Sequence, residues 1–288
     1  GADRTPQVFL LGAPAEDGSR AVLYRGRVDD QYGIGYANDK PRRKDLTIAM
    51  DETLAGKEIS QPATESIGCL IGRKRDVDPK SEITYGNQVS RILQNRCVEC
   101  HREGEIAPFA LTDYDEVAGW AEMIAEVIRD TRMPPWHADP AHGSFANDRR
   151  MSEAEKQTIY DWVAAGAPEG DPADLPESRE FLTDWVLPKE PDAVIYAHEE
   201  PHSVPAEGVI EYLYTSAATN FKEDKWVSVA EIVPGARSVV HHVIAFVRRP
   251  GQRNGDFGGA RGGFLAAYVP GMLVRPFPQG MAKFVPAG

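Results

Sequence analysis

Two thiols and an imidazole lie close together near the middle of the chain, and this cluster constrains the fold more than any other feature. Cys97, Cys100 and His101 fall within five consecutive positions of RCVECHREG, residues 96–104. The whole chain of 288 residues contains 3 cysteines and 7 histidines, so chance clustering is a poor explanation. We therefore expect this segment to fold so that two sulfurs and one ring nitrogen face a common group.

The segment around the cluster has helical periodicity. Residues 87–94 place apolar side chains on one helical face directly before Cys97. Residues 117–128 carry a stripe at i, i+3, i+4 and i+7, made of Val117, Trp120, Ala121, Ile124, Val127 and Ile128. Pro134 and Pro135 follow this second helix and end it.

Helix-start signals support two of the helices. Thr112 and Asp115 are spaced as a capping pair for the helix over 117–128, and Ser152 opens a third helix with the box SEAE. The third helix has an apolar face, made of Ile159, Trp162 and Val163. Three short helices of this kind have little apolar surface of their own, so we expect a bound group to complete their core.

The residues CVECH match the C-x-x-C-H pattern of covalent c-type haem attachment. Two thiols add to the vinyl groups of the porphyrin, and the following histidine binds the iron as proximal ligand. A structural zinc site would need a second pair of Cys or His ligands, and no cysteine follows Cys100. A thioredoxin-type redox motif begins a helix after a strand, whereas here a helical pattern precedes it. We predict that Cys97, Cys100 and His101 hold haem c.

The sixth position on the iron has three candidate ligands in DTRMPPWHADPAH, namely Met133, His137 and His142. Met133 is favoured, because the two prolines after it hold the following backbone in an extended form and present Met133 from a stiff loop. The alternatives are that His137 is the ligand, or that Met133 only fills the core. A thioether ligand raises the reduction potential relative to two histidines.

Residues 84–168 resemble a monohaem cytochrome c domain, of the kind with RCVECH early and RMPPWHADP after one long helix. We expect Phe109, Trp120 and Ile124 to line the porphyrin. The alternative is that these side chains only pack against one another.

Composition divides the chain into three segments, 1–76, 77–172 and 173–288. They carry 12 basic and 12 acidic groups, 9 and 18, and 11 and 14, which gives net charges of 0, −9 and −3. None offers the basic surface that phosphate binding needs, so nucleic acid and anionic lipid are poor partners. No apolar run is long enough to span a bilayer.

Residues 1–76 predict a β-hairpin from TPQVFLLG and AVLYRGRV, followed by a helix over 42–54. This order and the Thr5-Pro6 start resemble the C-terminal half of a thioredoxin or peroxiredoxin-like domain, which implies a cis proline before the hairpin and a domain that begins before residue 1. The alternative is an ordinary strand-start proline at Pro6. The family's redox cysteine is missing, so we expect a scaffold role. The lone Cys69 is expected to be a buried packing residue.

Residues 173–288 change period and predict a β domain. The linker PEGDPADLPESRE precedes three predicted strands, over 208–216, 225–233 and 238–247. His241 and His242 lie in the third of these. Neighbours on a regular strand face opposite sides, so both can reach one metal only if the strand is bent or bulged there.

Residues 226–243, WVSVAEIVPGARSVVHHV, and residues 263–288 resemble the N-terminal domain of copper type II, ascorbate-dependent monooxygenases, the peptidylglycine and dopamine hydroxylase class. In that family a His-His pair and a later histidine bind one electron-transfer copper. The resemblance places His241 and His242 at the pair, with the third histidine beyond residue 288. Imidazole ligands suit copper, and zinc is the alternative.

The expected fold is multidomain α+β: a partial thioredoxin-like segment, an all-α cytochrome c domain and an all-β sandwich, truncated at both ends. The expected function is electron transfer by covalent haem c to a copper monooxygenase-like domain, in the periplasm or another extracytoplasmic space. One alternative is a pure electron-transfer or binding module without copper, and another is a peroxidase-like protein in which Met133 is not on the iron. A redox protein or small-molecule reductant is the expected partner, and oligomeric state is left open.

Overall fold

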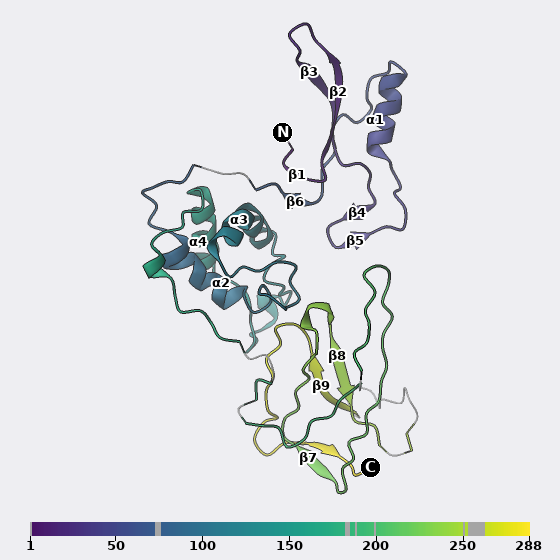
Figure 1. Ribbon diagram of the computed structural model, residues 1–288, viewed down its shortest axis with the longest axis vertical. Helices are drawn as coiled ribbons and strands as arrows, with labels where there is room; N and C mark the ends of the chain where they lie inside the picture. Colours follow the sequence, from purple (N-terminus) through teal and green to yellow (C-terminus); the bar gives the residue numbers. More distant parts are fainter. Residues whose placement is uncertain are drawn as a thin grey trace. The chain divides into compact units, whose positions relative to one another are not determined.

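The computed structural model describes residues 2–72, 76–181, 185–187, 189–198, 200–249, 251–252 and 263–288. The fold mixes short helices with small two-stranded antiparallel sheets, which confirms the predicted α+β class (Figure 1). The chain forms two compact units. Unit 1 comprises residues 1–82, 117–133 and 156–168, and unit 2 comprises residues 83–116, 134–155 and 169–288. The predicted division at residues 76 and 172 stays a prediction.

The N-terminal part of unit 1 is built on a hairpin. Strands β2 (Val8–Pro14) and β3 (Arg20–Gly26) pair antiparallel, which confirms the predicted hairpin. Strand β1 (Arg4–Thr5) pairs with β6 (Cys69–Leu70), and β4 (Tyr32–Gly33) pairs with β5 (Tyr36–Ala37). The Thr5–Pro6 peptide bond is cis, as expected for a proline before this hairpin.

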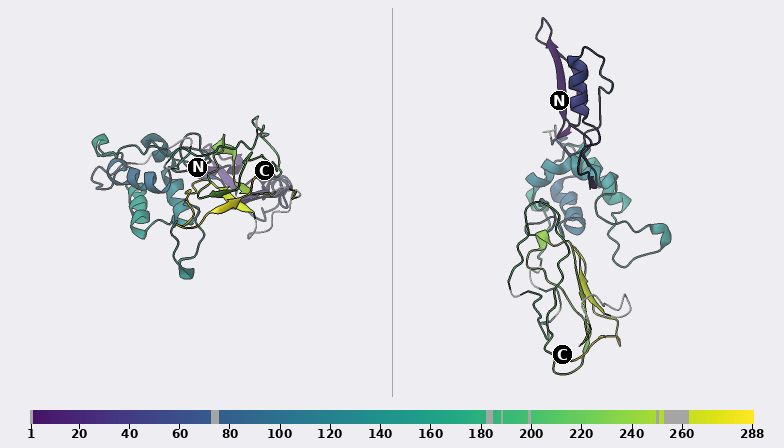
Figure 2. Two further views of the ribbon diagram at one scale, coloured as in Figure 1. Left: turned by 90° about the horizontal axis from the view of Figure 1, so that it is seen from below. Right: turned by 90° about the vertical axis from the view of Figure 1, so that its right-hand side faces the viewer.

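Helix α1 (Asp45–Leu54) lies along the hairpin, as both views show (Figures 1 and 2). It begins three residues later than expected and is followed by Gly56 at a φ of +66°. Ala49 is buried, but Met50 and Leu54 are 39% and 87% exposed, so only part of the apolar pattern faces the hairpin.

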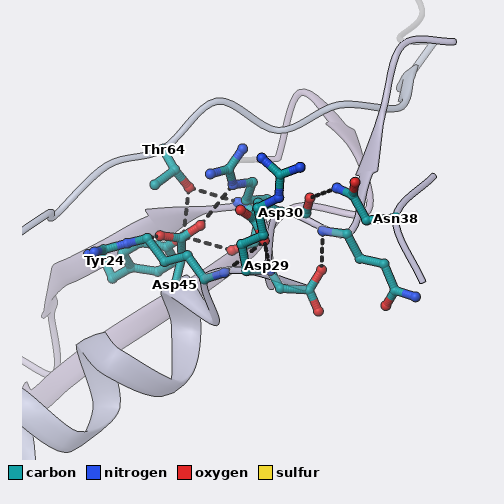
Figure 3. A network of polar contacts seen from close by, with 10 residues as sticks. Tyr24, Asp29, Asp30, Asn38, Asp45 and Thr64 are labelled. Carbon is teal, nitrogen blue, oxygen red and sulfur yellow. Dashed lines mark hydrogen bonds and ion pairs between the residues drawn. The ribbon is translucent and has the colours of Figure 1, made fainter. Parts of the chain in front are cut away.

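A buried carboxylate joins α1 to the end of the hairpin (Figure 3). Asp45, whose side chain is 1% exposed, accepts hydrogen bonds from Arg27 at 2.8 Å and Arg43 at 2.6 Å. Tyr24 lies beside it and shares a 2.6 Å hydrogen bond with the Thr64 hydroxyl. A buried carboxylate is stable only when it is paired in this way, so the network fixes helix, hairpin and loop together.

Cys69 differs from the prediction of a buried packing residue. It is an exposed free thiol in β6, and the two-stranded sheet that β6 forms with β1 leaves that side chain open to solvent.

Helix α3 (Tyr114–Arg129) forms where the apolar stripe predicts a helix, and its buried side chains are Val117, Ala121, Ile124, Ala125 and Ile128. Its cap differs by one residue from the expected Thr112–Asp115 pair. The Asp113 carboxylate accepts a 3.0 Å hydrogen bond from the backbone N–H of Glu116. The helix begins at Tyr114, so the residue directly before it, Asp113, supplies the cap in place of Thr112.

Helix α4 (Glu153–Ala164) begins at the predicted capping box. The Ser152 hydroxyl accepts from the Glu155 N–H at 3.2 Å, and the Glu155 carboxylate accepts from the Ser152 N–H at 2.7 Å. The predicted apolar face is buried, and Trp162 is fully buried with its indole N–H donating to the Pro168 carbonyl at 2.9 Å. This prediction is confirmed.

Unit 2 begins with one turn of π-helix, η1 (Tyr85–Val89), which continues into α2 (Ser90–Arg96). Thr84 caps this helix, with its hydroxyl accepting from Asn87 and the Asn87 side chain accepting in return. The predicted helix over 87–94 is confirmed and extends further at both ends.

The rest of unit 2 contains two strand pairs. Strand β7 (Lys225–Val227) pairs with β10 (Lys283–Val285), and β8 (Val243–Phe246) pairs with β9 (Phe264–Tyr268), both antiparallel. Strands β8 and β9 run side by side in Figure 1. Residues 208–216 form no strand, contrary to the prediction, because their backbone meets no ladder partner among the described residues. The two-sheet sandwich stays a prediction.

Among the described residues, no helix has the length and apolar character needed to cross a membrane.

Candidate functional site

The Cys97–His101 segment is a tight turn at the end of α2. The Cys97 N–H donates to the Leu93 carbonyl at 2.8 Å, so Cys97 continues directly from the helix. The Cys97 carbonyl then accepts from the N–H groups of both Cys100 and His101, at 3.1 and 3.0 Å. These bonds place both cysteines and His101 on one turn of backbone, which we call the attachment turn (residues 97–101).

Arg102 braces the attachment turn from its C-terminal side. Its guanidinium donates to the Glu99 carbonyl at 2.5 Å and to the Glu105 carboxylate at 2.6 Å. Its Cζ also lies 3.9 Å from the centre of the Phe181 ring. The turn is therefore held by the chain itself, without a disulfide between its cysteines.

Both thiols of the attachment turn are half-buried and free. Burial raises the pKa of Cys97 to about 12, and the neighbouring Cys100 acts in the same direction. Burial also raises the pKa of Cys100. Reactive redox cysteines have lowered pKa values and lie at helix N-termini, whereas this pair follows a helix and stays neutral at physiological pH. The local chemistry does not resemble that of a thioredoxin-type redox pair.

In the part of the chain that the structure describes, His101 engages one ring nitrogen in a hydrogen bond and leaves the other for a ligand. Its Nδ1 lies 3.2 Å from the carbonyl oxygen of Phe109, and the two rings are 4.9 Å apart at 51°. Metal-binding histidines commonly donate the second ring N–H to a carbonyl in this way, which fixes the tautomer and the ring orientation. Burial lowers the pKa of His101, which favours the neutral imidazole that metals require. The donor set of two neutral thiols and one oriented neutral imidazole fits covalent haem.

Phe109 was predicted to line the porphyrin, and it lies against the His101 ring. The other two predicted lining residues, Trp120 and Ile124, belong to α3 in unit 1, where Ile124 is buried and Trp120 is half-buried.

The predicted sixth ligand, Met133, lies in unit 1, just after α3. It is 40% exposed, and its N–H donates to the Val127 carbonyl at 3.1 Å. The backbone after it is not fully extended, because the Trp136 N–H turns back to the Pro134 carbonyl at 2.8 Å. The role of Met133 on the iron stays a prediction.

The alternative ligands His137 and His142 are both exposed residues of unit 2. The side chain of His142 is 83% exposed, and its Nε2 lies 3.8 Å from Asp139. In the sequence, Trp136 lies between Met133 and these two histidines. Its buried indole nitrogen has no hydrogen-bond partner within the described part of the chain. Trp136 was not identified as a candidate residue from the sequence. Its position within the motif RMPPWHADP was the one sequence signal that pointed to it.

His241 and His242 form a second candidate site. They lie between the short helix η4 (Arg237–Val239) and the first residue of β8, outside the strand, so the alternation of strand faces does not separate them. Their Nδ1 atoms are 2.9 Å apart, and the rings are 5.2 Å apart at 68°. Imidazole nitrogens bind zinc at about 2.0 Å, and two nitrogens at this separation can both reach one ion at such a distance. The same separation fits one N–H···N hydrogen bond between two neutral rings.

The described residues around the histidine pair supply no third ligand of the types His, Cys, Asp or Glu. Across the described residues, no group of three or more His, Cys, Asp or Glu side chains is arranged to hold a metal ion. The centre of the Tyr212 ring lies 5.8 Å from that of the His242 ring. The pair is therefore at most part of a metal site within the described residues.

Comparison of the chain with protein-family models, with curated proteins and with solved structures finds no match. The attachment turn and the histidine pair are therefore the features that indicate a function.

Proposed function

We propose that this protein is an electron-transfer protein that carries haem c covalently on Cys97 and Cys100, with His101 as the proximal ligand. A haem held there supplies one-electron transfer. The chain's part is to present two neutral thiols and one oriented imidazole from the attachment turn. The proposed location is the periplasm or another extracytoplasmic space.

One observation carries this proposal. The Phe109 carbonyl accepts from Nδ1 of His101, so Nε2 is the nitrogen available to iron. A zinc or redox role for the same cysteines would favour thiolates, and burial disfavours the thiolate at Cys97 and Cys100.

The test is expression of the whole chain in a host with haem-maturation machinery, followed by denaturation and extraction with acidified organic solvent. We expect pigment to stay with the polypeptide, because thioether bonds survive this treatment. The variant with Cys97→Ser and Cys100→Ser should lose all bound pigment. The matched control is Cys69→Ser, which removes the third, exposed thiol and should keep it. Colourless wild-type protein, or pigment that extracts, would refute the proposal.

A second candidate function is supported by the histidine pair. We infer that His241 and His242 bind copper, and that this copper exchanges electrons with the haem. The 2.9 Å separation of the two Nδ1 atoms favours this role, because it brings two imidazole donors within reach of one ion. A copper ion held there supplies a second one-electron centre.

Titration with Cu²⁺ followed by electron paramagnetic resonance tests this role. Wild-type protein should bind one copper with nitrogen hyperfine structure from imidazole, and His241→Ala or His242→Ala should weaken binding by at least about tenfold. His198→Ala replaces a histidine outside the pair and should leave binding unchanged. No copper signal in wild-type protein, with haem present, would favour the pure electron-transfer module without copper.

Met133→Ala should alter the ferric haem spectrum. A high-spin spectrum of the wild-type protein would instead support the peroxidase-like alternative, in which Met133 is not on the iron.

A further inference from the structure

Glu105 is a buried carboxylate that neither centre accounts for. Its residue is 8% exposed, in a loop four residues after His101. Arg102 holds one carboxylate oxygen at 2.6 Å. A buried carboxylate needs such a partner, but Arg102 alone would be enough to neutralise it.

A second arginine reaches the same oxygen from a distant part of the sequence. The Nε atom of Arg237 lies 3.8 Å from Oε1 of Glu105, and the side chain of Arg237 is 23% exposed. Arg237 is the first residue of η4, which leads directly to His241 and His242. The carboxylate therefore lies between the attachment turn and the segment that carries the histidine pair.

Tyr268 adds a second link on the same side. The guanidinium carbon of Arg237 lies 5.7 Å from the centre of the Tyr268 ring, which is close enough for a cation–π contact. Tyr268 is the last residue of β9 and pairs with Val243, the residue after His242. Burial raises the pKa of Tyr268, and the Arg237 guanidinium acts against this shift. Arg237 therefore contacts both Glu105 and the last residue of β9.

We propose that Glu105 is a positioning residue. Its carboxylate is held by Arg102 and Arg237, and it joins the attachment turn to η4 and the β8–β9 pair. This bridge sets where His241 and His242 lie relative to His101. Because electron transfer between two centres depends on how they are placed, this bridge couples them. The expected effect on electron transfer rests on the proposed function. The contacts of Glu105 with Arg102 and Arg237 do not depend on it.

The chain offers a matched control. Arg179 donates to the Glu99 carboxylate at 2.9 Å, and so forms an ion pair with the attachment turn from outside β8 and β9. Arg237→Gln and Glu105→Gln should disturb the histidine pair, whereas Arg179→Gln removes a comparable ion pair and should not. Arg237→Lys keeps the positive charge, so the histidine pair should be disturbed less than in Arg237→Gln.

The first measurement needs no copper. Hydrogen exchange of the backbone amides over 240–246 and 264–268 should be at least about tenfold faster in Glu105→Gln than in wild type, and unchanged in Arg179→Gln. In the second measurement, a light pulse on an added photoreductant reduces the haem in the Cu²⁺-loaded protein, and the reoxidation of the haem by Cu²⁺ is followed. Glu105→Gln should slow that first-order step at least about tenfold at unchanged haem content and copper stoichiometry.

The outcomes separate the two proposals. If wild-type protein lacks haem or copper, the proposed function fails and the exchange measurement alone decides the bridge. If both centres are present and Glu105→Gln behaves like Arg179→Gln in both measurements, the bridge is wrong and the proposed function stands. If hydrogen exchange is faster in Glu105→Gln but the electron-transfer rate is unchanged, the proposed coupling of the two centres is wrong.

Discussion

At the scale of single residues, a backbone carbonyl prepares the candidate site. The side chains that matter, Cys97, Cys100 and His101, are visible in the sequence, but the group that orients the imidazole is the carbonyl of Phe109. Any residue type supplies a carbonyl, so no sequence pattern marks this position. The orientation of His101 therefore comes from the loop between the motif and residue 109.

The protonation of Cys97 gives a test at the same scale. Its pKa is raised to about 12 by burial, so at pH 8 almost none of the nucleophilic thiolate is present in the folded, haem-free chain. We expect alkylation of Cys97 by iodoacetamide to be at least about tenfold slower than that of the exposed Cys69, and to accelerate as the pH rises toward 12. Peptide mass spectrometry gives the two rates in one sample. Unfolding in urea is the control and should make the two alkylation rates similar. Equal rates in the native protein would show that the pKa of Cys97 is not raised.

At the scale of the helix, periodicity located the elements better than it located their ends. The apolar stripe over 117–128 predicted α3, and the box at Ser152 predicted the start of α4. The cap of α3 was displaced by one residue, because apolar spacing marks the buried face and does not mark the turn that precedes it. Strand signals over 208–216 failed, because a strand needs a hydrogen-bonded neighbour that its own pattern does not specify.

The cap of α3 can be tested directly. Asp113→Ala removes the acceptor for the Glu116 N–H and should lower the free energy of unfolding by about 1 kcal/mol. Thr112→Ala, at the residue that the sequence pattern pointed to, should have a much smaller effect. Urea unfolding followed by circular dichroism measures both. A larger loss for Thr112→Ala than for Asp113→Ala would show that the cap lies at Thr112.

At the scale of the whole molecule, ion pairs join segments that are far apart in the chain. In unit 1, the Arg4 guanidinium in β1 donates to the Glu126 carboxylate in α3 at 2.5 Å, and Arg132 donates to the same group at 2.6 Å. The hydrogen bond from Arg4 is the main cause that lowers the pKa of Glu126, opposed by burial. The first strand and the third helix are thereby tied within one unit.

This pairing makes the stability of unit 1 depend on pH. Because the pKa of Glu126 is lower in the folded state, its contribution is present above the ordinary pKa of 4.5 and is lost as the pH falls through the folded value. Glu126→Gln should therefore lower the free energy of unfolding by about 2 kcal/mol at pH 7 and by less at pH 3. Urea unfolding at both pH values measures the difference. Glu58→Gln removes a carboxylate at an exposed position and is the control. An equal loss for Glu126→Gln at both pH values would contradict the pairing.

By itself, the sequence determined the features that depend on local spacing. These are the C-x-x-C-H cluster, the N-terminal hairpin, and the helices around the cluster, because a period of two or 3.6 residues and a capping box act over a few positions. Only the tertiary structure decided which groups from distant segments meet. The closeness of Glu105 to Arg237, the carbonyl behind His101 and the convergence of the His241 and His242 rings depend on how loops close, and loop closure has no fixed period in the sequence.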